Sequence, residues 1–106
     1  MNGAELITAE RQRQIDVERW TPEHDDKHVA GEMSAASSAY TLMACEQIYP
    51  EQYRTFEEQS LYHRDSSWPW DEEWWKPSPD PIRNLVKAGA LLCAEIDRLQ
   101  RAEGKL

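Results

Sequence analysis

The chain has 106 residues, of which 20 are acidic and 12 are basic, so its formal net charge is −8. This length suits one domain with a single core, spanning residues 1–106. The negative charge repels a phosphate backbone, so we expect no long nucleic acid as a partner. Its apolar runs fall short of the roughly 20 residues needed to cross a bilayer, and residues 1–5 lack the basic, apolar start of a secretion signal. We therefore expect no membrane partner and a location in a cytoplasm.

The first predicted helix begins at Thr8, whose hydroxyl suits the capping of the amides that follow. Residues 1–6 precede this cap and are expected to be flexible. Apolar side chains are sparse up to Trp20, so we expect this helix to lie on the outside of the domain. Proline disfavours helix in the residue before it, so Thr21 and Pro22 end the helix and a polar turn follows over residues 23–28.

A second helix is predicted from about residue 27 or 31 to Ile48. Alanines and serines between residues 30 and 39 give it a small-sided face, which allows close approach of another helix and predicts a central position. Cys45 in this helix and Cys93 further along stand far apart, so we expect two buried free thiols rather than a disulfide or a metal site. Residues 54–63 are expected to form a short helix or an irregular arm.

The last helix is predicted over residues 81–103. Asp80 caps it, Pro81 occupies its first position and Gly104 lies just beyond its end. Apolar residues from Ile82 to Leu99 recur at spacings of three and four, which predicts one continuous apolar face packed against the second helix. The fold class is therefore all-α, with three to four helices and a long loop rich in tryptophan and proline before the C-terminal helix. We call residues 65–80 the tryptophan loop.

A polar cluster lies just before the second helix and comprises His24, Asp25, Asp26, His28 and Glu32. His28 and Glu32 are four residues apart, so they share a helix face, and Asp25 approaches from the preceding turn. The cluster lacks the established zinc spacings. Three interpretations stay open: Asp25 or Asp26 caps the second helix while His28 and Glu32 form a polar contact, or the cluster is a small-molecule site, or it is a metal site.

The tryptophan loop holds four of the five tryptophans, within residues 68–75. Trp70, Trp74 and Trp75 are suited to sandwiching a planar ring, and Lys76 and Arg83 to holding a phosphate beside the first amides of the last helix. That is the chemistry of a nucleotide pocket. The alternatives are that these indoles form the end of a thin core, a dimer interface or a protein-binding surface.

Several segments together resemble a family of small proteins encoded by tailed phages and prophages: Ile7–Ile15, Trp20–Asp26, Trp68–Asp71, Trp74–Pro77 and Leu85–Leu91. This resemblance covers nearly the whole chain and implies a phage origin. A fainter likeness, carried by the Pro69-Trp70-Asp71 segment, is to the bacterial ryanodine-receptor repeat domain. That domain has a Pro-Trp-Asp segment and a Glu-x-x-Gly-Trp segment. In this chain the two segments come in the opposite order, and Arg19 stands in place of the glycine. This second resemblance implies nucleotide-derived ligands, and with the first it implies a counter-defence protein that captures a host immune nucleotide signal.

From the sequence we predict a non-catalytic, homodimeric binding protein for a nucleotide-like small molecule, with no cofactor. Besides Trp70, Trp74, Trp75, Lys76 and Arg83, the predicted ligand-binding residues are Trp20, His24, Asp25 and His28. One alternative is a protein-interaction module or acidic inhibitor that occupies a host protein. A second alternative is a metal-dependent hydrolase built on the polar cluster.

Overall fold

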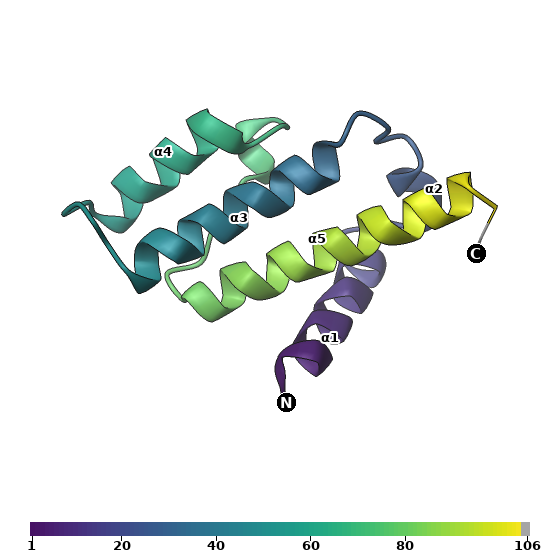
Figure 1. The fold of residues 1–106 in the computed structure, drawn as a ribbon, viewed down its shortest axis with the longest axis horizontal. Helices are drawn as coiled ribbons and strands as arrows, with labels where there is room; N and C mark the ends of the chain where they lie inside the picture. The colour runs from purple at the N-terminus through teal and green to yellow at the C-terminus, as the bar shows by residue number, and fades with distance from the viewer. Residues whose placement is uncertain (105–106) are drawn as a thin grey trace.

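The computed structural model describes residues 1–104 and confirms the all-α prediction: over these residues it contains five α-helices, one short 3-10 helix and no strand. Figure 1 shows α3 and α5 running side by side, with α4 along α3 and α1 crossing behind α5. None of the helices within residues 1–104 is long and apolar enough to cross a membrane. The elements in chain order are α1 (Gly3–Asp16), α2 (Pro22–Asp25), α3 (Glu32–Ile48), α4 (Phe56–Ser67), the 3-10 helix η1 (Glu72–Trp74) and α5 (Pro81–Ala102).

Helices α3 and α5 form the spine of the domain, and their small side chains allow the close packing that the sequence predicts. Ala36, Ala39 and Ala88 are almost completely buried between them. The hydroxyl of Ser37 donates to the backbone carbonyl of Ala88 at 2.8 Å, which brings a side chain of one helix onto the backbone of the other. The start of α5 is also as predicted, because the carboxylate of Asp80 accepts from the Ile82 amide at 2.9 Å.

Helix α1 begins at Gly3, so the prediction of a start at Thr8 is wrong, and residues 3–6 of the segment that we expected to be flexible belong to the helix. Asn2 and Glu5 form a capping box, in which each side chain accepts a hydrogen bond from the backbone amide of the other residue. Thr8 lies inside the helix, where its hydroxyl donates to the carbonyl of Ala4. The helix then crosses α5 at Gly89, where an added Cβ would lie 2.5 Å from the Cδ1 of Ile7.

The middle of the chain is more helical than predicted. The expected polar turn contains the one-turn helix α2, capped by Thr21, and α3 begins only at Glu32, after Gly31 in the left-handed conformation (φ 78°). Neither Asp25 nor Asp26 caps α3. Helix α4 carries a Thr55–Glu58 capping box and extends to Ser67, so it includes the first residues of the tryptophan loop.

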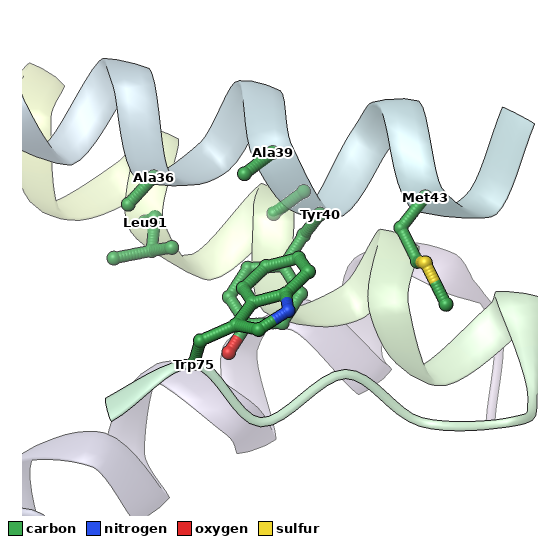
Figure 2. Close-up of a cluster of buried hydrophobic side chains, with 7 residues drawn as sticks. Ala36, Ala39, Tyr40, Met43, Trp75 and Leu91 are labelled. Carbon is green, nitrogen blue, oxygen red and sulfur yellow. The ribbon is translucent and has the colours of Figure 1, made fainter. Parts of the chain in front are cut away.

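Trp75 turns inward from the tryptophan loop and joins the core. Its ring lies 4.8 Å from the ring of Tyr40, centroid to centroid, and only 8% of the residue is exposed (Figure 2). The indole N–H donates to the carbonyl and the hydroxyl of Ser60, at 2.9 and 3.0 Å, and so connects the loop to α4. Burial raises the pKa of Tyr40 to about 12, although the Lys76 amide donates to its hydroxyl.

The apolar face predicted for α5 is not the face that packs against α3. Asn84, Ala88, Leu91 and Glu95 occupy the buried side of the helix. The larger apolar residues stay exposed by 41–60%: Ile82, Leu85, Leu92, Ile96 and Leu99. Both cysteines are free thiols, as predicted. The prediction that both are buried is wrong for Cys45, which is exposed, whereas Cys93 is partly buried.

Candidate functional site

A pocket of about 640 Å³ opens where the end of α1, α2, the tryptophan loop and the middle of α5 meet. This volume lies within the roughly 300–1,000 Å³ that is usual for small-molecule sites. We call it the tryptophan pocket. It is lined by Arg11, Gln14, Glu18, Arg19, Trp20, His24, Asp25, His28, Met33, Pro69, Trp70, Asp71, Trp74, Leu91 and Ala94.

A tight reversal after α1 brings one wall of the pocket into place. Arg19 adopts a left-handed backbone conformation (φ 63°), and the amide of Trp20 then donates back to the carbonyl of Gln14 at 2.9 Å. Arg11 fixes the reversal by donating to the carbonyl of Trp20 at 3.2 Å and to the carboxylate of Asp25 at 2.5 Å. The polar residues of α1 therefore hold the Trp20–Asp25 segment against the helix.

Aromatic rings form a continuous wall from α2 to the tryptophan loop. The centroid of the Trp70 ring lies 5.0 Å from that of His28 and 6.4 Å from that of Trp20. His24 in turn meets His28 edge to face at 5.0 Å. Trp74, which is 45% exposed, adds a further indole to the lining. Flat rings of this kind suit a planar ligand, because stacking needs area more than directional bonds.

Three polar atoms of pocket-lining side chains are buried and have no hydrogen-bond partner: Oε1 of Gln14, Nδ1 of His24 and Nε1 of Trp70. Gln14 as a whole is only 2% exposed, so its carbonyl oxygen has little access to water. His24 Nδ1 lies 3.6 Å from the nearest Asp25 oxygen, beyond hydrogen-bond distance. An unsatisfied buried polar atom costs about 1–3 kcal/mol. These atoms are covered when the pocket is empty, so a molecule that presents an acceptor to Trp70 and a donor to Gln14 would remove that cost once the side chains turn toward it.

The charges at the pocket are mostly paired with one another. Asp25 pairs with Arg11, and Glu18 pairs with Arg13 at 3.1 Å. Arg19 makes no ion pair within residues 1–104 and is exposed at the pocket, so its guanidinium is the cation available to a ligand. Close by, the pKa of Glu32 lies below its ordinary value, because its carboxylate accepts from its own backbone amide, from that of Ala30 and from His28.

The predicted ligand-binding residues fall into two groups. Six of them line the pocket: Trp20, His24, Asp25, His28, Trp70 and Trp74. The other three do not line it. Trp75 is buried in the core, Lys76 lies outside the pocket with its ammonium 5.6 Å from the centre of the Trp74 ring, and Arg83 donates to Glu10 at 2.6 Å.

Sequence reasoning missed Arg11 and Gln14, which lie in the second half of α1, and Arg19, which lies in the reversal after it. That helix has few apolar residues, which predicts a position on the outside of the domain. Instead its buried residues are polar, namely Glu10 and Gln14, one turn apart. A pair of polar residues facing the interior at helical spacing is the signal that would have indicated a polar lining here.

The polar cluster forms contacts within the protein. His28 Nδ1 lies 3.3 Å from Oε2 of Glu32, as one of the three open interpretations predicts, and Asp26 pairs with Arg101 at 2.7 Å. Within residues 1–104, no three His, Cys, Asp or Glu side chains lie close enough to hold a metal ion. Comparison with known proteins adds no further constraint: no family model, curated protein or solved structure matches this chain.

Proposed function

We propose that the protein binds a nucleotide-like small molecule in the tryptophan pocket and does not convert it chemically. The observation that carries this proposal is that a pocket walled by aromatic rings is lined by Gln14, His24 and Trp70, each of which has a buried polar atom without a hydrogen-bond partner. A nucleobase combines the matching properties, because it has a stackable face and an edge that carries both donors and acceptors.

The distribution of charge narrows the type of ligand. Arg19 offers a single unpaired guanidinium at the pocket, while Asp71 at the rim is exposed and acidic. The cations that the sequence suggested for phosphate, Lys76 and Arg83, lie elsewhere. We therefore infer a ligand with one base in the pocket and one phosphate near Arg19, rather than a chain of phosphates along α5.

Binding is tested by adding adenosine and guanosine monophosphates, cyclic dinucleotides and ADP-ribose separately to the protein. A ligand that binds the folded state raises the melting temperature, and stacking on Trp20, Trp70 or Trp74 quenches indole fluorescence. We expect both signals with at least one mononucleotide. No response to any of them at about 1,000 times a micromolar Kd, where linkage predicts about 4 kcal/mol of stabilisation, would refute the proposal.

Substitutions in the pocket then locate the bound molecule. Trp70→Phe keeps a stacking ring and removes the N–H donor, so we expect affinity to fall about tenfold, or about 1.4 kcal/mol. Arg19→Gln should weaken the mononucleotide but not the free nucleoside. Lys76→Gln is the matched control outside the pocket and should leave affinity unchanged. If Lys76→Gln weakens binding as much as Arg19→Gln does, the ligand lies in the position that the sequence alone suggested.

A further inference from the structure

Two rows of exposed residues run along α3 and α5, and neither row contains a charged side chain. On α3 the residues follow one another at steps of four and three, and on α5 at steps of three and four, so each row is one face of its helix. We call the two rows together the α3–α5 face. They consist of Ser34, Ser38, Thr41, Cys45 and Ile48 on α3, and Ile82, Leu85, Gly89, Leu92, Ile96 and Leu99 on α5; all of them are exposed except Gly89, which is half-buried.

The two rows are neighbours on the same side of the molecule. The hydroxyl of Ser34 donates to the carboxylate of Glu95 at 2.9 Å, and Glu95 lies within one turn of Leu92 and Leu99. Figure 1 shows α3 and α5 lying next to each other, with α1 crossing behind α5. Helix α1 reaches the edge of the face at Gly89, where Ile7 packs, and near Ile82, which lines a hollow together with Leu6 and Ala9.

We propose that the α3–α5 face is the interface through which two copies of this chain form a dimer. The face is self-complementary in shape, because α5 contributes large aliphatic side chains and α3 contributes mostly small ones. In this dimer the two-fold axis lies between the two copies and runs parallel to α3 and α5. It places α5 of each copy against α3 of the other copy. Each row of leucines and isoleucines then packs on a row of serine, threonine and cysteine, twice over.

The absence of charged side chains from both rows makes this face the place where two acidic copies can meet with least repulsion. Each chain carries a net charge of −8, so two copies repel each other wherever their acidic surfaces meet. The α3–α5 face is a broad surface on which they meet without bringing like charges together. A basic partner protein would gain little here, because the carboxylate between the two helices, that of Glu95, is buried and already paired with Arg98.

The area is sufficient for a specific, reversible dimer. From Ile82 to Leu99 the face is about 26 Å long at 1.5 Å per residue, and two helices side by side are about 20 Å wide. This footprint of about 500 Å² per copy corresponds to about 1,000 Å² in total, the lower limit for a specific interface. We therefore infer a dimer whose population depends on protein concentration. This inference does not depend on the proposed ligand.

Sedimentation velocity over a range of about 1–100 µM tests the proposal directly, since an interface near the lower size limit is expected to dissociate in that range. The mass should rise from the 12.4 kDa of one chain toward twice that value. Raising the salt to about 0.5 M should strengthen the dimer, because it screens the repulsion between the acidic chains and leaves the apolar contact intact. A monomer at every concentration and salt would overturn the proposal.

Single substitutions locate the interface. Leu92→Glu and Ser38→Arg each place a charge on the face, one on each helix, and we expect each to weaken dimerisation at least about tenfold. Leu61→Glu is the matched control, because Leu61 is similarly exposed (49%) but lies on α4. Circular dichroism and the melting temperature of the monomer show whether each variant is folded. A dimer that tolerates both substitutions on the face, or that is lost in Leu61→Glu, would place the interface elsewhere and overturn the proposal.

Cys45 provides a second readout that requires no substitution. It is exposed in the single chain and lies in the α3 row. Its reaction with a maleimide should slow as the protein concentration rises, because the partner copy covers it. In Leu92→Glu the rate should stay high at all concentrations. A rate that does not depend on concentration, in a protein shown to be dimeric, would contradict this interface.

Discussion

Replacing Trp75 with alanine should lower the free energy of unfolding by about 3–5 kcal/mol, the range measured for large aromatic residues removed from cores. Trp75 packs against Tyr40 and Trp68, with ring centroids 4.8 and 5.1 Å away, and is almost fully buried. Alanine leaves a cavity there and also leaves the Ser60 carbonyl without its indole donor. Urea denaturation followed by circular dichroism measures the change, because it does not rely on tryptophan emission.

Trp74→Ala is the matched control for this prediction. Trp74 is the next residue along the chain and has the same side chain, but it is 45% exposed and its ring faces the tryptophan pocket. We expect a loss of less than about 1 kcal/mol, since much of its surface already contacts water. An equal loss of stability for the two variants would mean that Trp75 does not hold the loop against the core.

Replacing Glu10 with glutamine should cost about 1–3 kcal/mol at neutral pH. Glu10 is 3% exposed and accepts two hydrogen bonds from Arg13, at 2.8 and 2.9 Å, and one from Arg83 at 2.6 Å. It therefore ties α1 to α5. Fully buried pairs lose about 3–5 kcal/mol when one partner is removed, but both guanidiniums here are 37% exposed, so solvent screens them and reduces the expected effect.

The same contacts make this contribution depend on pH. Burial alone would raise the pKa of Glu10, but the hydrogen bonds from Arg13 and Arg83 outweigh burial and hold the pKa below its ordinary value of 4.5. A depressed carboxylate pKa stabilises the fold above about pH 4.5, and this stabilisation is lost as the pH falls through the folded-state value.

Stability measured from pH 7 down to about pH 3 tests this prediction, because that window spans the ordinary pKa of the carboxylate. The wild type should lose more stability than Glu10→Gln over this range, so the two curves converge in acid. Glu73→Gln removes the same charge at an exposed position and should follow the wild-type curve. Parallel curves for Glu10→Gln and the wild type would show that Glu10 does not titrate as described.

The parts of the fold that follow local rules could be predicted from the sequence. Asp80 and Pro81 mark the start of α5 because capping and the missing proline amide act within a few residues. The small residues of α3 likewise predict a close helix partner. The start of α1 carries an equally local signal, because Asn2 and Glu5 have the spacing of a capping box. The sequence therefore contains enough information to place this start correctly.

Which side chains are buried depends on the tertiary structure and is harder to predict from the sequence. Trp74 and Trp75 are adjacent and chemically identical, so only the path of the loop decides which indole enters the core and which one faces the pocket. The apolar row of α5 presents a similar ambiguity, because periodicity reveals that a face is apolar but not what covers it. The polar side of α1 escaped prediction since a buried Gln14 becomes apparent only when its surroundings are known.

Arg19, in the reversal after α1, combines an unfavourable backbone conformation with a side chain that has no ion-pair partner within residues 1–104. Its φ of 63° is a conformation that glycine adopts freely and that costs a residue with a Cβ roughly 1 kcal/mol. Glycine there would remove this backbone cost, but it would also remove the unpaired guanidinium of a residue that lines the pocket. Folding stability and ligand affinity thus pull in opposite directions at one backbone angle.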